Sequence, residues 1–361
     1  MAELPPQLPP HLRLRARASG SNRAGRFERL DREVFDDGWQ IAEDETVVRT
    51  EVTEERPRSV ITRNTSPDIP FDRSLNPYRG CEHGCIYCFA RPSHAYLGLS
   101  PGLDFETRIV ARPGAAEVLK AELSRPGYRV APLAIGTNTD PYQPAEARYR
   151  SMRKILQVLR DHRHPVTVVT KSALIERDID ILAELAGDGL VHVGISVTSL
   201  ASRLSRRMEP RAPTPARRLA AISALSAAGI PVRVMVAPVI PALTDHEIEA
   251  ILGVAAEAGA TAASWIMLRL PLEVSPLFQD WLATHLPDRA ARVMARVRDM
   301  HGGRDYDARW GQRMRGTGKY AELIGRRFGR AARSLGLADE LAGLRCDLFK
   351  VPGRARQLSL L

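Results

Sequence analysis

The chain has 361 residues, of which 44% are hydrophobic and 26% charged, a composition typical of a globular protein with a sizeable core. It lacks any run of about 18 apolar residues, and prolines interrupt the stretch where a secretory signal would need its apolar segment. These features exclude a membrane span and a signal peptide, and they predict a cytoplasmic protein. The net charge of +10 would attract a polyanion, but only five of the 52 basic residues are Lys, so an arginine bias alone could explain it.

The N-terminal residues do not have the pattern of a packed domain. Residues 1–26 are rich in Pro, Arg, Ser and Gly and have few apolar side chains to offset the entropy of ordering, so we expect a disordered basic arm. Residues 27–70 carry mixed charge and form an N-terminal extension. Its run ETVVRTEV is typical of a β-strand and could form a small cap or an edge strand.

Residues 71–275 alternate short β-branched runs with amphipathic segments, which indicates βα units around a parallel sheet. The predicted strands are residues 74–78, 132–137, 165–171, 191–197, 231–239 and 262–268. Six such units predict an α/β fold, a partial (βα)6 TIM-like barrel instead of the full eight-fold barrel. Ligands are then expected at the C-terminal ends of the strands.

The rest of the chain is predicted to be a helical, basic C-terminal extension over residues 276–345 and an extended tail over residues 346–361. Residues 313–333 contain seven basic residues against one acid, interleaved with Tyr320 and Phe328. Such a helix could lie along a phosphate backbone and offer its rings for stacking. Alternatively, it is an amphipathic helix whose rings face the core and whose arginines are solvated.

Three of the four cysteines lie within eight positions, which favours a metal or cluster site over a disulfide framework. Cys81, Cys85 and Cys88 have the spacing C-x3-C-x2-C directly after the first predicted strand. An electron-transfer [4Fe-4S] cluster takes four cysteines, so three leave one iron open to another ligand. A zinc site with His83 or His94 as the fourth ligand is the alternative. The remaining cysteine, Cys346, is predicted to be a small buried hydrophobic residue.

With this spacing, and with the aromatic Tyr87 just before the last cysteine, the chain resembles the radical S-adenosylmethionine (SAM) superfamily. The resemblance implies an enzyme with a [4Fe-4S] cluster on Cys81, Cys85 and Cys88, whose open iron chelates SAM. One electron then cleaves SAM into methionine and a 5′-deoxyadenosyl radical, which abstracts hydrogen from a substrate. The family pattern further implies that Tyr87 lies against the adenine.

Three features together resemble the spore photoproduct lyase-like branch of this superfamily. They are the motif NPYRGCEHGCIYCFAR, the motif GTNTDPYQPAE and the strand end at Lys171. This resemblance implies that Thr139 and Asp140 contact the methionyl amine of SAM and that Lys171 approaches its carboxylate. The carboxylate of Asp140 suits the ammonium group of SAM, and the compact ammonium of Lys171 suits the carboxylate of SAM.

Two further SAM contacts are implied by the same resemblance. Ser196 matches a position near the methionyl or ribose group, with Thr198 and Ser199 as alternatives. Ala237 matches a backbone contact to the adenine. In the crossover after the fourth strand, Arg211 could bind a carboxylate or phosphate, or could simply form a loop ion pair with Glu209.

The chain departs from that branch at the hydrogen donor. Spore photoproduct lyase uses a cysteine beside the second-strand motif, where this chain has Thr137 and Asn138. We therefore do not expect thymine-dimer repair by that mechanism. Tyr142 and Tyr149 are the candidate hydrogen relays.

The expected substrate is nucleic acid, in repair or base modification, with a flavodoxin or ferredoxin as reductant. The alternatives are a radical SAM enzyme acting on a peptide or small molecule, and a non-catalytic iron–sulfur protein that binds nucleic acid. The terminal residues resemble the peptide by which repair proteins dock on the bacterial sliding clamp, and a tail is a suitable place for it. That predicted clamp-binding peptide consists of Gln357, Leu358, Ser359, Leu360 and Leu361.

Overall fold

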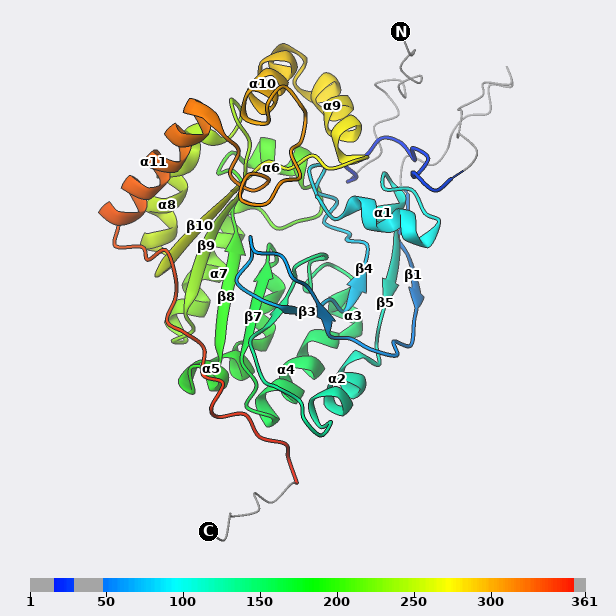
Figure 1. The fold of residues 1–361 in the computed structure, drawn as a ribbon, viewed down its shortest axis with the longest axis vertical. Helices are drawn as coiled ribbons and strands as arrows, with labels where there is room; N and C mark the ends of the chain where they lie inside the picture. The colour runs from blue at the N-terminus through cyan, green and yellow to red at the C-terminus, as the bar shows by residue number, and fades with distance from the viewer. Residues whose placement is uncertain (1–15, 29–47, 354–361) are drawn as a thin grey trace.

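The computed structural model describes residues 16–28 and 48–353, and a seven-stranded sheet forms its centre (Figure 1). The strand order is β10-β9-β8-β7-β6-β3-β2, with every neighbouring pair parallel except β2 and β3. The strands are β2 (Thr62–Arg63), β3 (Arg73–Leu75), β6 (Leu133–Ile135), β7 (Val166–Thr170), β8 (Val191–Ser196), β9 (Val232–Val239) and β10 (Ala262–Met267). The predicted partial barrel of six parallel strands is confirmed, and the barrel is not closed.

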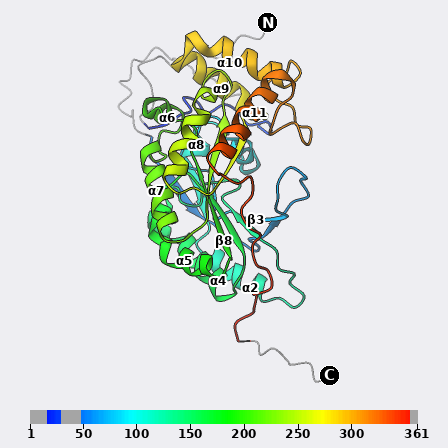
Figure 2. The same ribbon diagram turned by 90° about the vertical axis from the view of Figure 1, so that its left-hand side faces the viewer.

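Helices cover one face of the sheet. Figure 2 shows the sheet nearly edge-on, with α5 (Ile179–Gly187) and α7 (Pro215–Ala227) on the same side. The remaining helices of this layer are α2 (Ala115–Leu123), α4 (Ser151–Asp161) and α8 (Ile248–Glu257). Their apolar stripes pack on the β-branched residues of the strands in one large core. This packing is the reason that the alternating pattern of the sequence predicted the helices and strands. Within the described ranges, no helix is long and apolar enough to cross a bilayer.

A second, three-stranded sheet lies beside the barrel. It has the order β1-β5-β4, formed by β1 (Glu51–Glu54), β5 (Arg108–Ala111) and β4 (Tyr78–Arg79). Only the last two residues of the predicted β-type run, Glu51 and Val52, lie in β1, which pairs in parallel with β5 at the edge of this sheet.

Part of the predicted disordered arm is ordered. Residues 16–28 lie against the body, where the backbone amides of Ala18 and Ser19 donate to the Glu106 carboxylate at 3.1 and 3.0 Å. Gly102 permits the close approach, since a Cβ there would lie 2.2 Å from the carbonyl oxygen of Ser21. Hydrogen bonds to a buried carboxylate supply the ordering energy that the polar composition did not suggest. Residues 1–15 of the predicted arm lie outside the described residues.

The C-terminal extension contains three helices, as its composition predicted. Two of them, α9 (Val274–His285) and α10 (Pro287–Met300), form a second apolar core over the C-terminal ends of the strands. The third, α11 (Gly318–Ser334), packs on α8 and β10. The ring of Phe328 is buried 6.0 Å from that of Trp265, and the Tyr320 hydroxyl donates to Asp245. The Phe328 ring is therefore in the core and Tyr320 is partly buried, which supports the alternative of an amphipathic helix over the stacking role.

Residues 338–353 form a strap that crosses the N-terminal ends of the strands (Figures 1 and 2). It starts at a bridge between Ala338 and Ala262, and its Lys350 amide donates to the His162 carbonyl at 2.9 Å. Near its end, Phe349 packs among the rings of Tyr128, His162 and His164, with centroids 5.5, 6.4 and 5.7 Å away. Cys346 lies in this strap and is partly exposed, not buried as predicted, because the strap follows the surface.

We expect Phe349→Ala to lower the free energy of unfolding by about 1–2 kcal/mol, since it removes a partly buried ring from an aromatic cluster. Urea unfolding followed by circular dichroism measures this change. Leu335→Ala is the control, because its side chain is 39% exposed and its loss should cost under about 0.5 kcal/mol. Equal effects of the two substitutions would show that the strap is not held by Phe349.

Candidate functional site

The three motif cysteines lie together on one loop, residues 80–91, which follows β4 at the C-terminal end of the barrel strands. Cys81 and Cys85 are buried and Cys88 is half-buried. Burial raises the pKa of the Cys81 thiol, and the nearby Asp140, Cys85 and Cys88 raise it further. Burial likewise raises the pKa of Cys85, against the opposing charge of Lys171. The thiols are thus within electrostatic range of one another, as their sequence spacing predicted.

Two glycines allow this loop its shape. Gly80 and Gly84 have φ angles of +75° and +65°, which favour glycine. A Cβ on Gly84 would lie 2.6 Å from an Oε atom of Glu106, and one on Gly80 would lie 2.8 Å from the His94 ring. The cysteine loop, as we call residues 80–91, therefore packs too closely on its support for any side chain at these positions.

A fully buried ion pair between Arg91 and Glu106 supports the cysteine loop. The Arg91 guanidinium lies 2.5 Å from the Glu106 carboxylate, and both side chains are 0% exposed. Arg91 also donates to the carbonyl oxygens of Gly84 and Cys85 at 3.1 and 2.9 Å. Sequence reasoning did not find this pair. Its only sequence signal was an arginine three residues after the last motif cysteine, and nothing identified Glu106 as the partner.

Asp140 connects the cysteine loop to the ends of two barrel strands. Its carboxylate accepts from the Thr170 hydroxyl at 2.6 Å and the Lys171 amide at 2.8 Å, and it lies 3.3 Å from the His83 ring. Burial opposes its ionisation, but His83 and these hydrogen bonds lower the pKa of Asp140 to about 2. The neighbouring Thr139 hydroxyl donates to the Tyr78 carbonyl at 3.0 Å. The SAM contacts expected of Thr139 and Asp140 stay predictions.

The other residues matched to SAM lie around the same strand ends. The Lys171 ammonium is 5.9 Å from the centre of the Tyr87 ring. The Tyr87 hydroxyl lies 3.1 Å from the Thr198 hydroxyl, which in turn donates to the Ala237 carbonyl at 3.2 Å. Ser196 is buried at the end of β8, one strand away from Lys171. The structure thus brings the predicted residues together, while their roles toward SAM stay predictions.

A second buried ion pair supports this side of the site. Glu209 pairs with Arg218, and both side chains are at most 1% exposed. The same carboxylate accepts hydrogen bonds from Tyr87 and from Thr198. Arg218 also donates to the Ser196 carbonyl at 3.1 Å. Neither residue was identified as a site residue from sequence, because the pairing depends on the packing of α7 against β8.

The loop ion pair expected between Glu209 and Arg211 is wrong. Arg211 instead lies 3.1 Å from the carboxylate of Glu82, inside the cysteine loop, because Arg218 already occupies Glu209. Arg211 also donates to the Thr50 hydroxyl at 3.1 Å, which ties the strand-four crossover to the N-terminal extension. The alternative role of Arg211, binding a carboxylate or phosphate, stays a prediction.

The structure does not bring the candidate hydrogen relays to the cysteines. Tyr142 has no exposed surface, and its hydroxyl donates to Asp178 at 3.1 Å within the core. Tyr149 packs edge-on against Tyr78, with ring centroids 6.4 Å apart, and neighbours the small sheet. Both rings pack within the protein, and a relay role for either residue stays a prediction.

The donor set fits a [4Fe-4S] cluster with one open iron. The fourth cysteine, Cys346, is in the strap at the opposite ends of the strands. Among the described residues, no group of three or more His, Cys, Asp or Glu is arranged around a single metal ion, and the zinc alternative stays untested. In a cubane each cysteine binds a different iron, so three thiolates need not converge on one ion. The Nε2 atom of His94 lies 2.9 Å from the Arg108 carbonyl oxygen, which engages one of its two ring nitrogens.

The sequence matches a family model described as the Radical SAM superfamily over residues 75–255, which is half of the chain. The chain belongs to this superfamily. The matched residues contain the cysteine loop and the strands β6 to β9.

Similar sequences come from bacteria and archaea. The uncharacterized protein Rv2578c of Mycobacterium tuberculosis is 44% identical over 226 residues, covering 62% of this chain. The match spans 66% of the relative's length, just under two thirds. An uncharacterized protein of Methanocaldococcus jannaschii is 25% identical over 214 residues, which are 59% of this chain and 76% of the relative.

Solved structures of spore photoproduct lyase share the fold. One variant superposes with a TM-score of 0.58 at 15% identity, covering 81% of this chain and 82% of that one. A spore photoproduct lyase complexed with dinucleoside spore photoproduct gives a TM-score of 0.55 at 14% identity, covering 80% and 81% of the two chains. The predicted resemblance to this branch is therefore confirmed at the level of fold.

We expect Arg91→Met to destabilise the protein by about 3–5 kcal/mol, because it leaves the buried Glu106 carboxylate without a counter-charge. It should also lower the iron and sulfide content of the reconstituted protein, since the cysteine loop loses its support. Thermal unfolding and iron analysis measure the two effects.

The matched control is Arg217→Met, whose pair with Glu176 is more than half exposed on the arginine side and should contribute under about 1 kcal/mol. Wild-type iron loading in Arg91→Met would contradict the supporting role of the ion pair.

Proposed function

We propose that the chain binds a [4Fe-4S] cluster through Cys81, Cys85 and Cys88 and reductively cleaves SAM. The observation that carries this proposal is a set of three thiols on one loop, beside the strand ends that hold Asp140 and Lys171. When bound, the cluster supplies the single electron that breaks the C5′–S bond of SAM and yields methionine and the 5′-deoxyadenosyl radical.

The protein's own residues bind and orient SAM in this proposal. Lys171 offers a compact ammonium to the SAM carboxylate, and Asp140 with Thr139 faces its amine. The Tyr87 ring lies against the adenine, which the Ala237 backbone also contacts, and Ser196 faces the methionyl or ribose group. Support comes from their common position at the C-terminal strand ends, where βα barrels bind ligands.

A flavodoxin or ferredoxin is the proposed source of the electron. Thiolate ligands and a reducible cluster require a reducing compartment, so we place the protein in the cytoplasm.

The proposed substrate is nucleic acid, in base repair or modification. Three observations support it: the net charge of +10, the exposed Arg326, Arg330 and Arg333 on α11, and the shared fold with a lyase that binds a dinucleoside photoproduct. A peptide or small molecule is the second candidate substrate, and a non-catalytic iron–sulfur protein that binds nucleic acid is the third possibility. The chain has no cysteine in the second-strand motif, so its hydrogen donor differs from that of spore photoproduct lyase.

Anaerobic reconstitution tests the proposal. With dithionite and SAM, the wild-type protein should form 5′-deoxyadenosine, detected by chromatography, and SAM should perturb the cluster's electron paramagnetic resonance spectrum. Cys85→Ala should lose iron and product, whereas Cys346→Ala should keep both, because Cys346 lies in the strap. A fully loaded cluster that neither responds to SAM nor forms product would refute the enzymatic role, and mononuclear zinc would refute the site.

We also propose that residues 357–361 dock on the sliding clamp, although they lie outside the described residues. Deleting these five residues should abolish retention of the protein on immobilised clamp, because the peptide supplies the apolar contacts. Deleting residues 354–356 while keeping the terminal peptide is the control. Unchanged retention of the five-residue deletion would show that the tail is not the docking element.

A further inference from the structure

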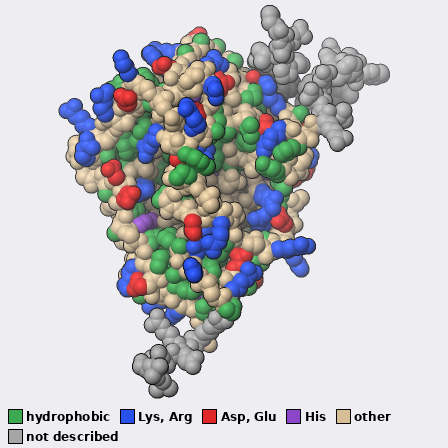
Figure 3. All heavy atoms as spheres, viewed as in Figure 1, with side chains coloured by type: hydrophobic (Ala, Val, Ile, Leu, Met, Phe, Trp, Pro, Cys, Tyr) green, Lys and Arg blue, Asp and Glu red, His purple; other side chains and the backbone are tan. Residues whose placement is uncertain are grey.

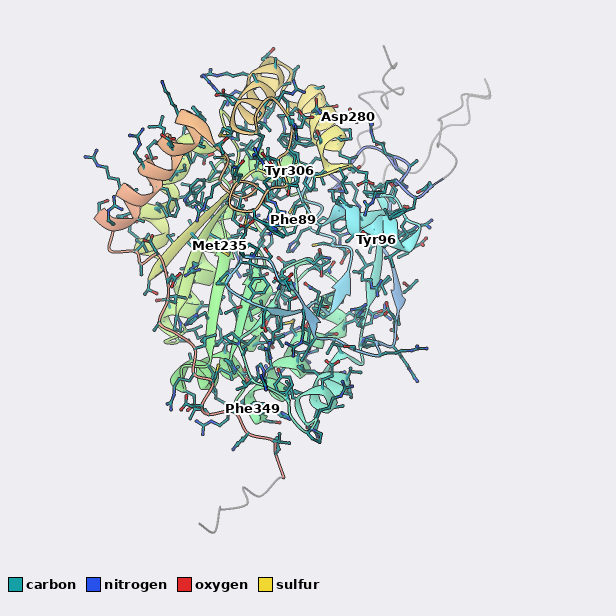
Figure 4. The ribbon with its side chains drawn as sticks, viewed as in Figure 1. Phe89, Tyr96, Met235, Asp280, Tyr306 and Phe349 are labelled. Carbon is teal, nitrogen blue, oxygen red and sulfur yellow. The ribbon has the colours of Figure 1, made fainter. Side chains whose placement is uncertain are left out.

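Phe89 exposes an aromatic ring directly after the last motif cysteine. Phe89 is 42% exposed, whereas the preceding Cys88 is half-buried. Figure 4 shows Phe89 near Tyr306 on the face toward the viewer. An exposed ring contributes little to the core, and a single one is common on protein surfaces, so the neighbours of Phe89 decide whether it belongs to a binding site.

Arg269 connects the Phe89 ring to that of Tyr306. Its guanidinium lies 4.7 Å from the Phe89 centroid and 5.9 Å from that of Tyr306, whose hydroxyl accepts a hydrogen bond at 3.3 Å. Arg269 follows β10 by two positions, so it stands at the same strand ends as the cysteines. It makes no ion pair within the described ranges, and its Nε is buried without a hydrogen-bond partner.

The loop that carries Tyr306 is held in place by helices α9 and α10. The preceding Asp305 accepts from Arg298 at 2.7 Å, from Ser275 at 2.6 Å and from Gln279 at 3.0 Å. This fixed position lowers the entropic cost of binding a ligand against the ring.

A second pair of an arginine and an aromatic ring, Arg313 and Trp310, is linked to the first pair through Asp68. Arg313 lies 4.1 Å from the centroid of Trp310, which is 56% exposed. Asp68 joins the two pairs: it lies 2.6 Å from Arg313, and Arg269 is also within its electrostatic range. We call Phe89, Arg269, Tyr306, Trp310 and Arg313 the aromatic–arginine strip. Figure 3 shows that apolar and basic side chains mix on this face.

The chemistry of the strip favours one class of ligand. Nucleobases stack on aromatic rings and on guanidinium planes, and arginines also bind phosphates. A regular duplex offers only its phosphates, because its bases are stacked inside. An acidic protein would pair with the arginines but would leave the exposed rings unused.

We propose that the aromatic–arginine strip binds an unstacked segment of nucleic acid and that Phe89 stacks on a base at the entrance to the cysteine loop. This inference deepens the proposed function, on which its link to a reaction rests. Binding itself does not require turnover.

The test measures the affinity of the anaerobically reconstituted holoprotein for a fluorescein-labelled single-stranded oligothymidylate. Phe89→Ala and Tyr306→Ala should each weaken binding by about tenfold, since each removes one stacking ring. Phe89→Leu should weaken it similarly, because leucine keeps the apolar bulk but has no π face. A duplex of the same length should bind more weakly than the single strand to the wild-type protein.

The matched control is Tyr96→Ala. Tyr96 is 72% exposed and also carries an arginine, Arg26, at 4.9 Å, but it lies away from the strip in Figure 4. Its substitution should leave oligonucleotide affinity unchanged. Iron content and 5′-deoxyadenosine formation without substrate are recorded for every variant.

Wild-type affinity in both Phe89→Leu and Tyr306→Ala would overturn the proposal. An absence of oligonucleotide binding would also overturn it. So would displacement by inorganic polyphosphate as effective as displacement by unlabelled oligothymidylate, because polyphosphate has no bases and binding would then not depend on base stacking. If the ring variants lose binding while no protein forms 5′-deoxyadenosine, the strip stands and the proposed reaction fails.

Discussion

The site depends on a charge that cannot be left alone in the core. Transferring a carboxylate or guanidinium from water to a protein interior costs several kcal/mol, so Glu106 and Arg91 are stable only as a pair with further hydrogen bonds. Those hydrogen bonds reach the carbonyls of the cysteine loop on one side and the amides of residues 18 and 19 on the other. One ion pair therefore fixes the position of the three cysteines and of the N-terminal segment together.

The same principle recurs around the site. Asp140 links the cysteine loop to β6 and β7, and Glu209 with Arg218 links the Tyr87 ring to β8 and α7. Each carboxylate accepts several hydrogen bonds from different elements, so no single one can move without leaving a buried group unpaired. The residues assigned to SAM in the proposed function are thus held by hydrogen bonds within the protein, which reduces the cost of ordering them on binding.

Local patterns in the sequence were sufficient for the architecture and for the cysteine motif. Each barrel strand was predicted within a few residues, because β-branched runs and amphipathic segments report local geometry. Long-range pairing was not predictable. Glu106 lies 15 positions from Arg91, and no sequence pattern connects the two residues. Arg211 was assigned to Glu209, its neighbour in sequence, because its observed partner Glu82 is close to it only in space. The order of residues 16–28 was missed for the same reason: its partner is a distant carboxylate.

The open barrel leaves two sheet edges, formed by β2 and β10, and each is partly covered. At one end β2 pairs with only two residues of β3, and at the other the strap begins with a single bridge to β10, while the Met267 amide donates to the Met314 carbonyl. An unprotected edge of a parallel sheet would invite strand addition by a second molecule. The β2–β3 hairpin and the start of the strap thus cover part of each edge, so the barrel can stay open without presenting a fully unpaired strand.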